Sequence, residues 1–107
     1  MMEAAEHLIT YRFSLFISPG SAASEQAVYN LKKICEFLGE GDCEVEVINV
    51  KDNPQRAEID RIMAIPTLIK GKPFPALRII GDLSNHQRVL EAMGYVPRDA
   101  IRVLPIT

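Results

Sequence analysis

The sequence predicts an α/β domain whose elements follow the order β-α-β-α-β-β-α. Three observations lead to this class. Apolar residues first alternate at period two, then recur at helical spacing, and short extended segments separated by proline-rich turns follow. The chain has 107 residues, 48% of them hydrophobic and 24% charged, which is typical of one globular domain. We expect that domain to span residues 1–107, with a flexible N-terminus over 1–10 and a C-terminal tail over 95–107.

The first two elements are a strand and a long helix. Alternate apolar side chains predict a strand over Tyr11–Ile17, which Pro19-Gly20-Ser21 ends. From Ser24, apolar residues follow a helical stripe that includes Cys35, and Gly39 ends this helix. The next strand is expected over 44–50 and, because it is rich in Val and Ile, mostly buried.

The second half begins with a helix-start signal. Asp52-Asn53-Pro54 combines a capping side chain with a proline suited to the first turn, and we expect a helix to about Met63. Pro66 then stops it. Residues 67–70 and 76–80 are predicted to form an antiparallel pair.

The last helix is expected over residues 85–93. Ser84 and Gln87 have the spacing of a capping box, Val89 belongs to a narrow apolar stripe, and Gly94 suits the C-terminal cap. The apolar part of the tail, 101–106, could pack or pair at a sheet edge. This overall order is thioredoxin-like.

Thioredoxin-like folds carry a CxxC pair between the first strand and first helix, where the helix N-terminus lowers thiol pKa values. The corresponding loop, residues 18–24, has no thiol, so dithiol exchange at that place is excluded. Cys35 lies on the apolar stripe, where it is expected to be inert. Cys43 sits near a turn and could be exposed. A bridge between them would be unusual in a cytoplasmic protein.

Other chemistry finds little support in the sequence. His7 and His86 have no acid or nucleophile at a defined spacing and are expected to be solvated. Asp82 is better explained by a turn and helix start than by catalysis or metal binding. We therefore predict no catalytic residue, no metal site and no cofactor.

Charge and hydropathy exclude two classes of partner. The 12 basic residues are dispersed and opposed by 14 acidic ones, for a formal charge of −2, so we expect no nucleic-acid binding. No apolar run approaches the ~20 residues of a membrane span, and the N-terminus lacks a signal pattern. We expect a cytoplasmic protein without membrane contact.

Three prolines cluster after the second helix. Pro66 occupies the place where thioredoxin-like folds keep a cis-proline, and Pro73 and Pro75 follow. This segment is either a site of slow conformational exchange or a rigid loop.

Three motifs resemble the KaiB family of circadian clock proteins in order and spacing. They are Asn53-Pro54-Gln55-Arg56-Ala57-Glu58, then Ala64-Ile65-Pro66-Thr67-Leu68, and above all Arg78-Ile79-Ile80-Gly81-Asp82-Leu83-Ser84. The resemblance runs from about Tyr11 to Leu90, and the first loop of that family also lacks the CxxC pair.

The resemblance implies a non-catalytic clock or stress-signalling protein with two folds. The implied ground state is a homo-oligomer, a tetramer or dimer, in equilibrium with a thioredoxin-like monomer. The monomer would bind the N-terminal ATPase ring of a KaiC-type protein and displace a sensor histidine kinase. In the other fold the C-terminal half changes secondary structure, so the helix expected over residues 85–93 would be a strand.

The resemblance also implies two sets of residues. A partner surface would use Ser14, Gln26, Glu46, Asp52, Arg61 and Lys70, although only the last two keep the charge common in cyanobacterial members. A switch would involve Pro66, Pro73, Pro75, Gly81, Asp82, Ala92 and Gly94. Ala92 replaces a glycine common in that family and favours helix by about 1 kcal/mol.

Two alternatives stay open. The chain could be a KaiB-like sensor domain related to a KaiC-binding histidine kinase, which shares the element order. It could also be a thioredoxin-like redox protein that uses Cys43.

Overall fold

The computed structural model describes residues 10–95, and its elements follow the predicted order. They are β1 (Tyr11–Ile17), α2 (Ala22–Leu38), the 3-10 turn η1 (Glu40–Asp42), β2 (Cys43–Asn49), α3 (Pro54–Ile59), β3 (Thr67–Lys72), β4 (Leu77–Ile80) and α4 (His86–Ala92). The expectations for residues 1–9, His7 among them, and for the tail over 96–107 lie outside the described residues.

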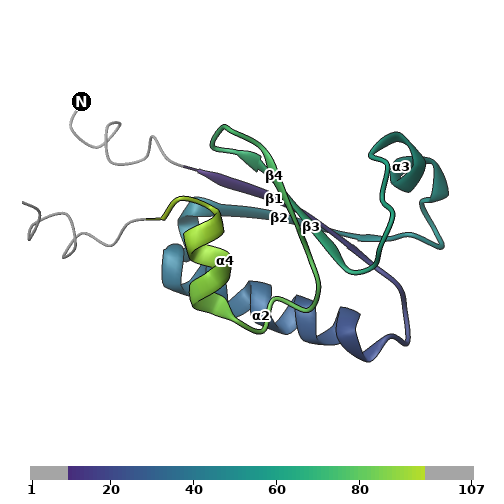
Figure 1. Cartoon of the computed structure of the whole chain (residues 1–107), viewed down its shortest axis with the longest axis horizontal. Helices are drawn as coiled ribbons and strands as arrows, with labels where there is room; N and C mark the ends of the chain where they lie inside the picture. The colour runs from purple at the N-terminus through teal and green to yellow at the C-terminus, as the bar shows by residue number, and fades with distance from the viewer. Residues whose placement is uncertain (1–9, 96–107) are drawn as a thin grey trace, which may run out of the picture.

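The four strands form one sheet in the order β2-β1-β3-β4. β1 runs parallel to β2 and antiparallel to β3, and β3 runs antiparallel to β4. Figure 1 shows α2 and α4 on one side of this sheet, which we call the helix face, and α3 beyond one end of it. The opposite side is the open face. The predicted α/β class and the antiparallel β3–β4 pair are confirmed.

The main core lies between the sheet and the helices on the helix face. Its buried residues come from β1, α2, β3 and the segment that carries α4: Phe13, Leu15, Ala27, Leu31, Ile34, Cys35, Leu68, Leu83 and Val89. Burying apolar side chains of this kind contributes about 1.5–3 kcal/mol each. The predicted apolar positions of β1 and α2 are therefore core positions. The same core includes residues of β3 and of the α4 segment, so it holds the two halves of the chain together.

α2 begins at Ala22, two residues earlier than predicted, because Ser21 is the residue that caps it. The Ser21 side chain accepts a hydrogen bond from the Ser24 backbone N–H at 3.2 Å. Ser24 itself is buried, and its hydroxyl accepts from the Ser18 N–H at 3.0 Å. These two serines fix the loop where thioredoxins carry their thiols.

The prediction that the second strand is mostly buried is wrong. In β2 only Ile48 is buried, whereas Val45 and Val47 are 45% and 46% exposed. β2 is an edge strand of the sheet. A groove lies between β2 and α2, and Val45 and Val47 line this groove instead of packing in the core. Composition alone does not reveal an edge position, since Val and Ile favour strands wherever these lie.

The helix after Pro54 starts as predicted but ends at Ile59 rather than near Met63. Arg61 adopts a left-handed backbone conformation (φ 55°), which a continuing helix does not allow. The expected Asx cap is also wrong, because the Asn53 side chain donates to the Asn49 carbonyl at 3.0 Å instead of capping α3.

α4 confirms the predicted last helix, yet its cap is Asn85 and not Ser84. The Asn85 side chain accepts from the Arg88 N–H at 3.1 Å. The Ser84 N–H instead donates to the Asp82 carboxylate at 3.0 Å, which makes residues 82–84 a turn. The turn reading of Asp82 is therefore confirmed. The Ile65–Pro66 peptide bond is cis as expected, and the bonds before Pro73 and Pro75 are cis as well.

Candidate interaction surface

A single row of side chains crosses the open face from one edge of the sheet to the other. Glu46 of β2 pairs in register with Ser14 of β1, Ser14 with Ile69 of β3, and Ile69 with Arg78 of β4. Paired residues of neighbouring strands lie on the same face. The helix face takes the alternate positions of β1, which are buried in the core. We call Glu46, Ser14, Ile69 and Arg78 the transverse row.

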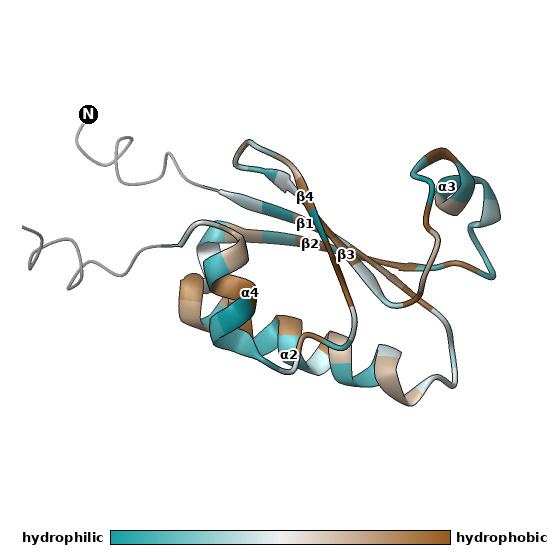
Figure 2. Ribbon diagram, viewed as in Figure 1, coloured by the Kyte–Doolittle hydropathy of each residue, from teal (hydrophilic) through white to brown (hydrophobic). Residues whose placement is uncertain are grey.

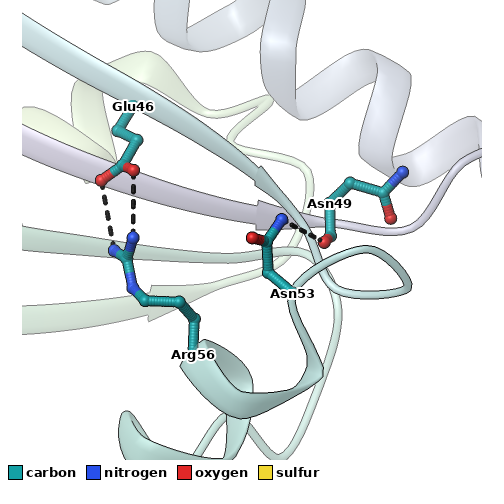
Figure 3. Close-up of polar contacts among 4 residues, drawn as sticks. All are labelled: Glu46, Asn49, Asn53 and Arg56. Atoms are coloured by element: carbon teal, nitrogen blue, oxygen red, sulfur yellow. Dashed lines mark hydrogen bonds and ion pairs between the residues drawn. The ribbon is translucent and has the colours of Figure 1, made fainter.

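Both charged ends of the row hold the segment that contains α3. Glu46 accepts two hydrogen bonds from the Arg56 guanidinium, at 3.0 and 3.2 Å, as Figure 3 shows. At the other edge, Arg78 donates to the Arg61 carbonyl at 3.2 Å and to the Asp60 carbonyl. The segment is thus tied to both edge strands of the sheet.

The Glu46–Arg56 pair is solvent-exposed. Its hydrogen bonds hold the pKa of Glu46 below its ordinary value and raise that of Arg56. Exposed pairs of this kind contribute little to global stability, since water and salt screen them. The pair therefore orients α3 rather than stabilising the fold.

A polar turn connects β2 to α3 and presents Asp52. Asn49 accepts from the Lys51 N–H at 2.8 Å and donates to the Asp52 carboxylate at 3.3 Å. The Asn53 side chain closes the turn on the Asn49 carbonyl (Figure 3). Asp52 is exposed in the turn that leads from the end of β2 into α3.

Large apolar side chains are exposed around these charges. Ile59 of α3 is 75% exposed, Met63 is 91% exposed and Ile80 at the end of β4 is 65% exposed. Figure 2 shows apolar stretches on and next to α3, away from the helix layer. Exposed apolar groups set among polar ones are typical of protein–protein contact surfaces.

The structure brings only part of the predicted partner set together. Ser14 and Glu46 are direct neighbours in the transverse row, and Asp52 and Arg61 lie in the segment tied to it. Gln26 is exposed on α2, which covers the helix face, so the sheet separates it from Ser14 and Glu46.

The expectation that Lys70 lies on the partner surface needs a correction. Its side chain is 1% exposed, and its ammonium group donates to the Pro73 carbonyl at 2.5 Å and the Pro75 carbonyl at 2.9 Å. In this structure it cannot meet a partner. Lys70 instead organises the β3–β4 connection, which contains two of the predicted switch prolines.

The remaining switch residues lie between β4 and the end of α4. Gly81 (φ 122°) donates its N–H to the carbonyl of the buried Pro66 at 3.0 Å. Ala92 is the exposed last residue of α4, and Gly94 (φ 78°) follows the helix with its N–H bonded to the Glu91 carbonyl at 3.0 Å. The expected glycine at the helix end is confirmed.

Asn30 is the residue that sequence reasoning missed. It is 6% exposed on α2, and its amide donates to the Asp82 carbonyl at 2.8 Å. Its side-chain oxygen lies 2.9 Å from Nε2 of His86. His86 is therefore half-buried and bonded, and the expectation of a solvated histidine is wrong. The signal in the sequence was a polar residue at a position of the apolar stripe, three residues after Ala27 and four before Ile34, since a polar side chain that is buried there needs a hydrogen-bond partner.

Neither cysteine lies where a thioredoxin dithiol lies. Cys35 is buried near the end of α2, and burial raises its pKa to about 12, with a smaller contribution from Cys43. Burial also raises the pKa of Cys43. Within residues 10–95, no cluster of three or more potential metal ligands occurs and no helix is long and apolar enough to cross a membrane.

A thioredoxin fold that lacks thiols in its first loop and carries a mixed charged and apolar open face defines a class of thioredoxin-like interaction domains. The KaiB domain family matches residues 14–95 of this chain. The circadian clock protein KaiB3 of Synechocystis is 49% identical over 84 residues, covering 78% of this chain and 81% of that protein. The circadian clock oscillator protein KaiB of Synechococcus elongatus is 44% identical over 76% of this chain and 79% of that protein. The chain belongs to the KaiB family of circadian clock proteins.

Solved structures confirm the thioredoxin-like fold. Chloroplastic thioredoxin z superposes with a TM-score of 0.67 at 26% identity, over 87% of this chain and 84% of that one. The N-terminal domain of Synechococcus elongatus SasA does so with a TM-score of 0.64 at 24% identity, over 92% and 90%. The second likeness concerns the fold alone.

Proposed function

We propose that this protein is a non-catalytic clock or stress-signalling module of the cytoplasm that binds the N-terminal ATPase ring of a KaiC-type protein through its open face. The transverse row is the observation that carries this proposal. It forms one continuous surface of polar and apolar side chains from one edge of the sheet to the other. Exposed Ile59 and Met63 add apolar contact area beside it. Membership of the KaiB family supports the choice of partner.

The direct test is size-exclusion chromatography with light scattering. The full chain is run alone and after hours of incubation with the host's KaiC-type ATPase and ATP. A slow shift of this protein into a ring-sized complex is the expected result. If no complex forms at any time, with or without ATP, the proposed partner is wrong.

Matched variants locate the surface. Ser14→Glu places a long acidic side chain in the centre of the transverse row, next to Glu46, and is expected to weaken binding at least tenfold, since a buried charge without a partner opposes docking. Ala23→Glu adds the same group at an exposed position of α2, on the helix side, and should leave affinity unchanged. Gln26→Glu then shows whether the partner also reaches α2, as the family resemblance implies.

We further propose that the thioredoxin-like monomer exchanges with a homo-oligomeric ground state, a tetramer or dimer, in which the second half refolds. All predicted switch residues lie between Pro66 and Gly94, in the half that follows α3. Backbone NMR assignment alone and in an oligomer-sized fraction tests this. One set of secondary shifts under all conditions would contradict it. Exchange rates unchanged by substitution of Pro66, Pro73 or Pro75 would exclude these prolines from the switch.

A sensor domain related to a KaiC-binding histidine kinase is the second candidate, favoured by the SasA likeness in fold. Such a domain would keep one thioredoxin-like fold, so ring binding together with one set of secondary shifts under all conditions would favour the sensor domain over a fold-switching KaiB protein. The redox alternative finds no support at the first loop. An insulin-reduction assay in which activity disappears with Cys43→Ser would revive it.

A further inference from the structure

Two cysteines lie together on the helix face of the sheet, away from the open face. Cys35 is in the last turn of α2, and Cys43 is the first residue of β2. Between them the chain folds back tightly: the Gly39 N–H donates to the Cys35 carbonyl at 2.9 Å, and the Asp42 N–H donates to the Gly39 carbonyl at 2.9 Å. This turn brings the end of the helix next to the start of the strand.

Both thiols line the same groove between α2 and β2, which has a volume of about 410 Å³. Cys35 belongs to the buried core, and Cys43 packs against that core as a partly buried neighbour. The two thiols are close enough to perturb one another electrostatically. Both are free in this structure.

We propose that Cys35 and Cys43 form a reversible intramolecular disulfide by exchange with a small disulfide oxidant such as glutathione disulfide. Cytoplasmic disulfides of this kind are transient and redox-dependent. The bond would join α2 to β2 at one end of the groove. This inference does not rest on the proposed partner, because the two thiols lie on the helix side of the sheet.

The order of the two steps follows from exposure. The thiolate of the half-buried Cys43 attacks one sulfur of the oxidant, forms a mixed disulfide and releases one glutathione thiolate, which takes up a proton. The thiol of Cys35 then loses its proton to solvent and attacks Sγ of Cys43, releasing the second glutathione. Both protein thiols are oxidised, and one glutathione disulfide is reduced to two glutathione molecules.

The electrostatic environment sets the rate. Burial raises the pKa of Cys43, the neighbouring Cys35 thiol opposes this in part, and Asp42 adds to it. Burial raises the pKa of Cys35 to about 12, so Cys43 is the thiol that ionises first. Because both thiols are mainly protonated near neutrality, exchange is expected to accelerate about tenfold per pH unit over the range in which the thiolate fraction grows.

The test uses the full chain in buffers of increasing oxidised-to-reduced glutathione ratio at about pH 8, near the ordinary thiol pKa. After acid quenching, intact mass and non-reducing peptide maps are recorded. The expected product has lost two hydrogens, contains a peptide linking Cys35 to Cys43, and reverts with reduced glutathione. A persistent glutathione adduct on Cys43, a disulfide-linked dimer, or two freely alkylated thiols at every ratio would overturn the proposal.

Single-thiol variants provide the controls. Cys35→Ala removes the resolving thiol, so the mixed disulfide on Cys43 should accumulate instead of disappearing. Cys43→Ser leaves only the buried thiol and should react at least tenfold more slowly. Circular dichroism verifies that each variant is folded. If Cys35→Ala is unfolded, the linked peptide in the unmodified chain decides the question by itself.

Discussion

Asn30 of α2 and His86 of α4 are joined across the two helices, with Oδ1 of Asn30 2.9 Å from Nε2 of His86. The Asn30 amide also donates to the Asp82 carbonyl at 2.8 Å. One buried side chain therefore holds both the turn before α4 and its first residue. This contact connects the half of the protein that we propose to keep its fold with the half that we propose to switch.

Asn30→Leu should weaken this connection. The substitution keeps similar volume but leaves the Asp82 carbonyl and the His86 ring without their buried partner, at a cost of about 1–3 kcal/mol. Hydrogen exchange should accelerate over residues 82–93 more than over β1. Gln26→Leu, at an exposed position of the same helix, is the control and should leave exchange unchanged. Equal protection in both variants would show that Asn30 does not hold α4.

Lys70→Met should loosen the β3–β4 connection. Methionine resembles lysine in shape, but it leaves the carbonyls of Pro73 and Pro75 without their charged donor, which costs about 1–3 kcal/mol. Urea unfolding should show the loss, and exchange over residues 71–77 should increase. Lys72→Met, at an exposed position of the same strand, is the matched control. A variant that loses partner binding with full stability would instead return Lys70 to the partner surface.

Ala92→Gly should shift the proposed equilibrium away from the thioredoxin-like form. Glycine disfavours helix by about 1 kcal/mol relative to alanine in a helix interior, and less at the last residue of α4. NMR signals of the helical form should decrease severalfold at most. Ala23→Gly in α2 tests whether any helix weakening has the same effect. A strand at 89–93 in the unmodified monomer would contradict the structure itself.

The Glu46–Arg56 pair should depend on pH and salt. The pKa of Glu46 is lower in the folded chain than in the unfolded one, so the pair is fully formed above the unfolded value of about 4.3. It is lost as the pH falls through the folded pKa. An NMR titration should give a midpoint below the ordinary glutamate value that returns toward it in Arg56→Gln. Unchanged midpoints in the two proteins would mean that α3 is held by other contacts.

Arg56→Gln should also free α3 without unfolding the protein. Hydrogen exchange should accelerate over 54–60, whereas the urea midpoint stays nearly constant, since exposed pairs contribute little to stability. Arg12→Gln, which removes the exposed pair with Glu44 at the other end of β2, should leave α3 unaffected.

Local patterns predicted much of this fold. Alternation in Tyr11–Ile17, the apolar stripe of α2 and the proline before α3 each act within a few residues, so the sequence determined where most elements begin. The absence of thiols from residues 18–24 likewise excluded thioredoxin chemistry at that loop without any structure. The three motifs identified the family for the same reason, since they are read along the chain.

Only the tertiary structure decided which of these residues are accessible. From the sequence, the charge of Lys70 suggests a surface position. In the structure Lys70 is buried, because its ammonium group donates to two backbone carbonyls that follow β3. Asn30 meets His86 across a sequence separation of 56, and the exposure of β2 depends on its place at the edge of the sheet. Burial and pairing are set by neighbours that are remote along the chain, whereas capping, turns and periodicity are set by adjacent ones.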